Sequence, residues 1–164
     1  MQTVRRVFAL VAAAGVLMVA AVPAQASTPR WVCLLRAINS VRASHGLRPI
    51  TTSWRLRAAA RRHSSDMLWR GYFAHTSPTG STLTHRVIRS GFVTYGQWWA
   101  GETLAWGSGA YGDPAAVVKA WLKSPEHRSI VLSSRYHLVG IGRAYGTFLG
   151  HPGASVWTVD WGHR

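Results

Sequence analysis

The sequence is poor in cysteine and in acidic residues. One cysteine, Cys33, in 164 residues excludes a disulfide scaffold within the chain and a zinc site built from cysteines. Neither a Walker-type phosphate loop nor a G-x-G-x-x-G fingerprint between a strand and a helix is present. Only five acidic residues stand against 19 Lys and Arg, which gives a formal charge of +14. In such a chain each carboxylate needs an explanation.

The first 26 residues are predicted to form a secretory signal. Two arginines at residues 5–6 are followed by an almost wholly apolar run over residues 8–22 and by an A-x-A cleavage site at 24–26. A retained membrane anchor is the alternative, but the apolar run is short for a membrane span. Cleavage after Ala26 removes both arginines and leaves a secreted, extracellular chain, residues 27–164, with a formal charge of +12.

The remaining chain predicts one α+β domain in which helices come first. Apolar residues at helical spacing predict one helix over residues 31–45 and a second between Ser53 and Gly71. A short third helix is predicted to open at Ser81 and to close at Gly91. Asp113-Pro114 predicts a fourth helix, with the aspartate as side-chain cap and proline at the first helical position.

Two strands are predicted near the end of the chain. Residues 138–145 and 155–161 have the character of an antiparallel hairpin, with a Gly-rich turn between them. The Gly- and Trp-rich stretch over 96–106 is given no element. No repeat, low-complexity run or linker divides residues 27–164, which predicts a single domain. Most of the nine Trp are expected in the core, Trp121 and Trp157 among them.

The five acidic residues have different expected roles. Asp113 is the predicted helix cap, and Asp66 is expected to form an exposed ion pair with arginines one helical turn away. Asp160 is expected to be a satisfied polar group beside the core. Glu102 interrupts an apolar strip, so we expect its carboxylate to be at least partly buried and paired with a His or an Arg.

Among the eight histidines, His75 and His127 lie in predicted loops, where sites are commonly built. Glu126 directly precedes His127. His63 falls on the apolar face of the second helix, which favours a hydrogen-bonded core residue over a ligand.

Five segments, taken in order, resemble a known family. They are ARRHSSDM at 60–67, YFAHTSPTG at 72–80, GETLA at 101–105, WLKSPEHR at 121–128 and VGIG at 139–142. The chain resembles a bacterial secreted SCP-like domain of the CAP superfamily, which comprises cysteine-rich secretory proteins, antigen 5 and plant pathogenesis-related proteins. The resemblance implies an α-β-α sandwich, with a small antiparallel sheet between helical layers and a central cleft.

The resemblance also implies a set of cleft residues. In this family two His and two Glu typically line the cleft and can bind a divalent metal such as zinc. Carried over by position, His75, Glu102 and His127 match three of them, whereas Ser124 stands at the place of the fourth. Glu126 is expected in the cleft beside the second His, at a place where bacterial members usually have Gly.

Two imidazoles and one carboxylate could hold zinc with an open position for water. Without metal, Glu102 could instead orient one of the histidines. The residues therefore predict an extracellular ligand-binding module, with a metal-assisted, peptidase-like hydrolase as the alternative. No G-x-S-x-G elbow and no set of nucleophile, base and orienting group can be named, so enzymatic activity is not the favoured prediction.

The basic charge predicts an anionic partner. An anionic cell-wall polymer or a membrane surface fits the charge, and a lipid ligand is implied by the resemblance only. The alternative is that the basic residues form a solvated surface that serves solubility and binds no partner. Nucleic acid is disfavoured because no binding motif accompanies the charge, and the chain is expected to be a monomer. The first two predicted helices hold Arg36, Arg42, Arg48, Arg55, Arg57, Arg61 and Arg62.

Overall fold

The computed structural model describes residues 27–93 and 96–164, and the predicted signal segment lies outside these ranges. The elements in chain order are α1 (Arg30–Ser44), β1 (Thr51–Thr52), α2 (Trp54–Arg70), α3 (Leu83–Arg89), β2 (Trp99–Ser108), the 3-10 helix η1 (Gly109–Gly112), α4 (Pro114–Lys123), α5 (Pro125–Val131), β3 (Leu138–Phe148) and β4 (His151–His163).

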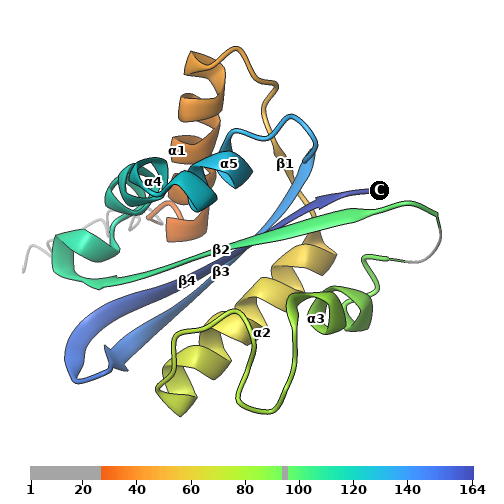
Figure 1. Ribbon diagram of the computed structural model, residues 1–164. Helices are drawn as coiled ribbons and strands as arrows, with labels where there is room; N and C mark the ends of the chain where they lie inside the picture. The colour runs from red at the N-terminus through yellow and green to blue at the C-terminus, as the bar shows by residue number, and fades with distance from the viewer. Residues whose placement is uncertain (1–26, 94–95) are drawn as a thin grey trace, which may run out of the picture.

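One four-stranded sheet lies between two layers of helices (Figure 1). The strand order is β1-β3-β4-β2, with α1, α4 and α5 on one face and α2 and α3 on the other. This arrangement confirms the predicted α-β-α sandwich. The three long strands are antiparallel, whereas β1 pairs parallel to β3 through two residues only.

The predicted hairpin is present and longer than predicted. Strands β3 and β4 extend to Phe148 and His151, and the turn between them is Leu149-Gly150. Both turn residues have positive φ, 47° and 83°, a backbone that suits the twist of a two-residue hairpin and favours glycine. The predicted turn glycines Gly146 and Gly153 lie within the strands instead.

The stretch that received no predicted element forms β2. It pairs with β4 over ten residues, from Trp99 opposite His163 to Ser108 opposite Ala154. Helices cover both faces of the sheet, so β2 lacks the polar–apolar alternation of a half-exposed strand. This strand is the one that carries Glu102.

Two helix caps differ from the prediction. Helix α3 begins at Leu83, because the hydroxyl of Thr82, rather than Ser81, accepts the hydrogen bond from the His85 backbone N–H. Asp113 precedes α4 as predicted but makes no side-chain cap bond. Its carboxylate instead accepts from the Arg30 guanidinium, because a charged donor binds a carboxylate more strongly than a neutral amide does.

Helix α2 lies directly against the backbone of β3. A Cβ added at Gly140 would lie 2.0 Å from the carbonyl carbon of Leu56, and one added at Gly142 would lie 2.3 Å from that of Ala60. No side chain fits in these gaps. The VGIG segment is therefore glycine-rich because α2 occupies the space of the missing side chains.

The tryptophans largely follow the expectation. Trp121, Trp157 and Trp161 are fully buried, and three more pack against the core clusters. The exceptions are Trp54, Trp69 and Trp99, whose exposed fractions are 69, 82 and 52%.

We predict that Gly142→Ala lowers the free energy of unfolding by about 1–3 kcal/mol, because the new methyl group forces α2 away from the sheet. Urea denaturation monitored by circular dichroism measures this loss. Gly146→Ala in the same strand is the control. There the Cβ would meet only a Leu68 side-chain carbon at 3.4 Å, so a change within about 0.5 kcal/mol is expected. Equal losses for both variants would contradict the close-approach argument.

Candidate functional site

Glu102 lies at the centre of the predicted cleft with only 2% of its side chain exposed. Its Oε1 accepts a hydrogen bond from His75 Nδ1 at 2.7 Å, and its Oε2 accepts one from Arg86 Nη2 at 2.6 Å. Both kinds of expected partner are therefore present, and the prediction of a buried, paired carboxylate is confirmed.

Arg86 connects this carboxylate to the loop that precedes α3. Its side chain is 8% exposed, and its Nη1 donates to the backbone carbonyls of His75 at 3.0 Å and Ser81 at 2.9 Å. Arg86 was not among the predicted site residues. Its position beside Val87 on the apolar face of a short helix could have indicated it, because a buried guanidinium needs an acidic partner and the chain has few acidic residues.

His63 lies behind Glu102, fully buried in α2. Its Nε2 donates to the Ala74 carbonyl at 3.0 Å, which confirms the predicted hydrogen-bonded core histidine. The same nitrogen lies 4.0 Å from Glu102 Oε2, so His63 also borders the site. Burial lowers the pKa of His63, which keeps the ring neutral.

Tyr72 links His63 to Asp66. Its hydroxyl donates to Asp66 Oδ2 at 2.5 Å and lies 3.4 Å from His63 Nδ1. Burial and the Asp66 carboxylate raise the pKa of Tyr72 to about 12. Asp66 also forms the predicted helical ion pair, accepting from Arg70 at 2.8 Å.

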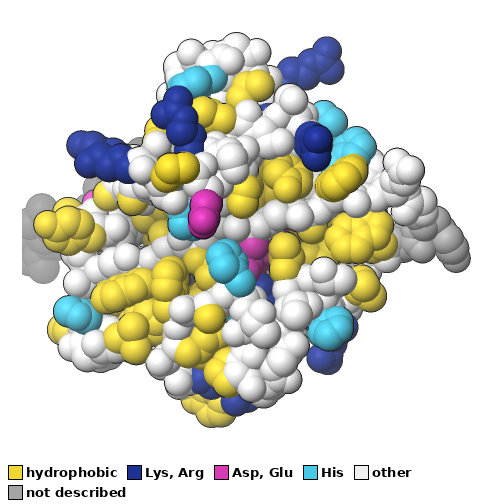
Figure 2. Space-filling view, viewed as in Figure 1, with side chains coloured by type: hydrophobic (Ala, Val, Ile, Leu, Met, Phe, Trp, Pro, Cys, Tyr) yellow, Lys and Arg dark blue, Asp and Glu magenta, His cyan; other side chains and the backbone are white. Residues whose placement is uncertain are grey.

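His127 lies at the start of α5 and not in a loop as predicted, and it approaches the site from the opposite helical layer. Its Nδ1 shares a hydrogen bond of 2.9 Å with Ser124 Oγ, at the position where the family's second Glu is missing. Glu126 is exposed and makes no hydrogen bond to either cleft histidine within the described residues. Figure 2 shows histidine and acidic side chains together near the centre of this face, bordered by hydrophobic ones.

The two cleft histidines differ in their preferred protonation. The hydrogen bond to Glu102 raises the pKa of His75. Burial, and then the charge of His75, lower the pKa of His127. Burial raises the pKa of Glu102, but the His75 hydrogen bond and the Arg86 charge outweigh it, so the net shift is downward. The cleft thus presents a readily charged imidazole beside a neutral one.

The surroundings of Glu102 bear on the predicted zinc ligands. Both oxygens of Glu102 accept hydrogen bonds, and one donor is the positively charged Arg86. Over residues 27–93 and 96–164, no three His, Cys, Asp or Glu side chains gather in a metal-binding group. A metal bound directly to Glu102 would share these oxygens with His75 and Arg86. Zinc on His75, Glu102 and His127 stays a prediction.

Asp160 was expected to be a satisfied polar group, and this expectation is wrong. It lies on β4 directly opposite Glu102 and is fully buried, and neither of its carboxyl oxygens has a hydrogen-bond donor within the described residues. Burial, and then the charge of Glu102, raise the pKa of Asp160 well above its usual range. Burial and the neighbouring Glu102 charge thus favour the neutral form of the Asp160 carboxyl.

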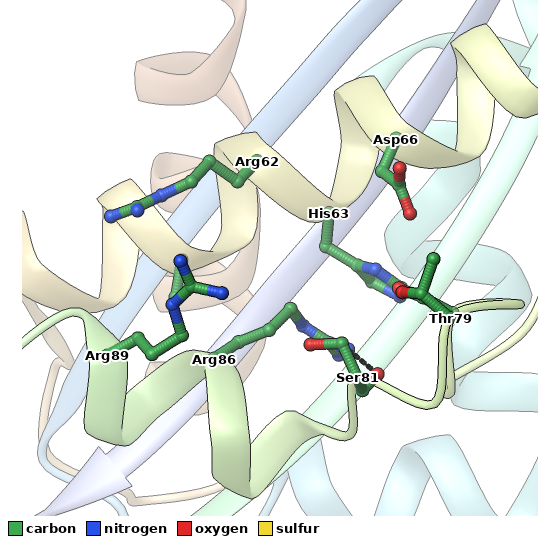
Figure 3. Close-up of a pocket in the computed structure, with 9 residues that line it drawn as sticks. Arg62, His63, Asp66, Thr79, Ser81, Arg86 and Arg89 are labelled. Atoms are coloured by element: carbon green, nitrogen blue, oxygen red, sulfur yellow. Dashed lines mark hydrogen bonds between the residues drawn. The ribbon is translucent and has the colours of Figure 1, made fainter.

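A pocket of about 230 Å³ adjoins the site between α2, α3 and the intervening loop (Figure 3). Arg62 from α2 and Arg89 from α3 lie at its exposed side, whereas His63 and Arg86 form its buried wall. Because His63 and Arg86 also border Glu102, the pocket and the cleft share one wall.

Residues 35–161 match the cysteine-rich secretory protein family, CAP. The chain belongs to this family. Two curated relatives from Bacillus subtilis strain 168 are similar to it. The uncharacterized membrane protein YlbC is 37% identical over 70% of this chain, and the uncharacterized protein YkwD is 34% identical over 73%. The CAP chain spans only 32% and 42% of the length of these proteins.

Solved structures agree with this assignment. An extracellular protein containing an SCP domain from Bacillus anthracis str. Ames superposes with a TM-score of 0.69 at 27% identity, covering 82% of this chain and 40% of that one. An outer surface protein from Borrelia burgdorferi shares the fold, with a TM-score of 0.66 at 22% identity over 81% of this chain and 91% of its own. In the part of the CAP chain that the structure describes, no helix combines the length and the apolar character that a membrane span requires.

We predict that Arg86→Met lowers the free energy of unfolding by about 3–5 kcal/mol at neutral pH, because it leaves the Glu102 charge buried with weaker compensation. Urea denaturation measures the loss. Arg89→Met on the same helix removes an exposed arginine and is expected to change stability by no more than about 0.5 kcal/mol. If the two variants prove equally stable, the ion pair does not have the structural role assigned to it.

Asp160→Asn is predicted to change the pH dependence of stability. The native pKa of Asp160 is raised, so its contribution to stability is fully present below the unfolded pKa and is lost as pH rises through the native pKa. The amide cannot ionise and avoids this loss. We therefore expect the free energy of unfolding of Asp160→Asn to gain on the wild type as pH rises from about 4 to 7. A difference that is independent of pH over this range, measured by urea denaturation, would show that Asp160 does not titrate in this way.

Proposed function

We propose that this CAP protein is a secreted binding module of the cell exterior, and that its cleft recognises a polar ligand through His75 and His127. The observation that carries the proposal is the way His75 is held. Glu102, itself almost fully buried, accepts a hydrogen bond from His75 Nδ1 at 2.7 Å, while 58% of the His75 side chain is exposed to solvent. A ring that is oriented by a buried carboxylate and is still accessible to solvent is suited to binding a ligand.

Secretion is supported by the predicted signal segment and by the two structural neighbours, which are an extracellular protein and an outer surface protein. The positive charge favours an anionic cell-wall polymer over a neutral lipid as the partner. We propose a monomeric domain over residues 27–164 for this role.

A hydrolase is the second candidate, and one contact favours it. Ser124 Oγ and His127 Nδ1 lie 2.9 Å apart, as a nucleophile and its base would. A triad also needs a group that orients the base, and no carboxylate in the described residues forms a hydrogen bond with His127. The binding function is therefore preferred.

The test is retention on purified cell envelope. We expect His75→Ala/His127→Ala to reduce retention about tenfold or more, because each imidazole offers the ligand a hydrogen-bonding nitrogen and His75 can also carry a positive charge. His45→Ala/His85→Ala, which removes two exposed histidines outside the cleft, should be retained like the wild type. Equal retention of both double variants would refute the proposed binding role of the cleft.

Two further arms distinguish the alternatives. Release of soluble fragments by the wild type but not by Ser124→Ala would favour the hydrolase over the binding module. Retention lost in EDTA and restored by zinc would assign a metal to the imidazoles. Because Glu102 is already paired, we expect EDTA to leave retention unchanged.

A further inference from the structure

A second hollow, of about 260 Å³, lies at the edge of the sheet and shares no residue with the cleft. We call it the arginine hollow. Strand β1 pairs only with Leu138 and Val139, so most of this edge of β3 has no strand beside it within the described residues. Helices α1 and α2 approach here from opposite faces. The lining residues are Arg30, Trp31, Arg57, Arg61, Ile141 and Arg143.

Positive charge in the arginine hollow greatly exceeds negative charge. Asp113 pairs with Arg30 and is the sole acidic partner of these four arginines within residues 27–93 and 96–164. The Arg61 side chain is exposed and makes no hydrogen bond or ion pair with any described residue. Arg57 Nε is buried without a hydrogen-bond partner in the same ranges. About three positive charges thus lack a counter-charge.

Two of these guanidinium groups are held by contacts other than carboxylates. Arg57 lies over the Trp31 ring, 4.2 Å from its centroid. Arg143 donates from Nε and Nη2 to Ser155 Oγ at 3.1 and 2.9 Å, and lies 4.7 Å from the Tyr145 ring centroid. These contacts fix the arginines and leave N–H donors free. Burial, and then the charge of Arg30, lower the pKa of Arg143, as expected for crowded cations.

The cationic surface continues beyond the arginine hollow. A neighbouring hollow on the outer face of α2 shares Arg61 with it and adds Arg62 and the exposed Trp69. The one acidic residue of that neighbouring hollow, Asp66, is already paired with Arg70. Successive arginines along one helix face suit a ligand that carries several anionic groups in a row.

We propose that the arginine hollow binds a phosphate-type oxyanion and that its natural occupant is a chain of linked phosphate groups. Guanidinium groups match the oxygens of a phosphate with paired N–H donors, and convergence of several from different elements gives a defined site. The competing explanation is that the arginines only keep the open edge of β3 from pairing with another chain. That explanation predicts no saturable anion binding.

The experiment is isothermal titration calorimetry of the full chain with tripolyphosphate at constant ionic strength. Arg57→Gln/Arg61→Gln should bind about tenfold or more weakly than wild type, because it removes two charged donors. Arg36→Gln/Arg48→Gln is the matched control: it removes the same charge from exposed sites outside the hollow and should bind within about twofold of wild type. Arg61→Gln alone, at an exposed side chain, should weaken binding without affecting the fold.

Two probes identify the ligand. Inorganic phosphate should bind about tenfold or more weakly than tripolyphosphate, since it cannot reach both hollows. Absence of saturable tripolyphosphate binding, or equal losses in both double variants, would overturn the site. An oligonucleotide that binds more tightly than tripolyphosphate at equal phosphate concentration would overturn the assignment to a phosphate chain without bases. The cleft variants His75→Ala/His127→Ala should bind tripolyphosphate normally, so this test is independent of the proposed function.

Discussion

The buried ion pair between Glu102 and Arg86 is the constraint on which the site depends. A carboxylate removed from water costs several kcal/mol unless it is paired and hydrogen-bonded. Here the pair lies between β2 and α3, and Arg86 also holds the carbonyls of His75 and Ser81. One charge pair therefore fixes strand β2, helix α3 and the loop that precedes α3. It also sets the position of His75, whose backbone is held by Arg86 and whose ring is held by Glu102.

Charge balance beneath the cleft follows from this pair. The Arg86 charge neutralises the Glu102 carboxylate, so a second negative charge on Asp160 would have no counter-charge, which together with burial raises the pKa of Asp160. His63 is buried and neutral. The buried carboxylate is thus balanced by a buried guanidinium, and His75, whose side chain is 58% exposed, is the group through which the cleft can present charge to solvent.

Residue patterns predicted one α+β domain and the central carboxylate, and the family resemblance implied the α-β-α layers. Glu102 was identified because a charge in an apolar strip must be paired, and the structure shows that pairing. Arg86 was missed because its partner lies on a later strand, and an arginine on a short helix is usually exposed. Asp160 was misjudged because a polar residue beside the core was expected to have a hydrogen-bond partner, whereas helices cover both faces of the sheet and bury its carboxyl without one among the described residues. The local sequence pattern of a strand does not show whether helices from distant parts of the chain cover both of its faces.

Some of the arginines are buried and others lie at the surface, and only those at the surface are available to a binding partner. Arg42, only 2% exposed, donates to the carbonyls of Arg48, Val131 and Ser133 and so joins α1 to the end of α5. Arg86 is likewise committed to the interior. Such arginines donate hydrogen bonds to backbone carbonyls inside the protein and are not available to ligands. Three arginines around the β3 edge are different, because none of them has an acidic partner in the described residues: Arg57 and Arg143 are held by aromatic rings and a serine, and Arg61 is exposed. The high net charge is thus informative about partners only after the internal arginines are set aside, and what remains is concentrated along α2.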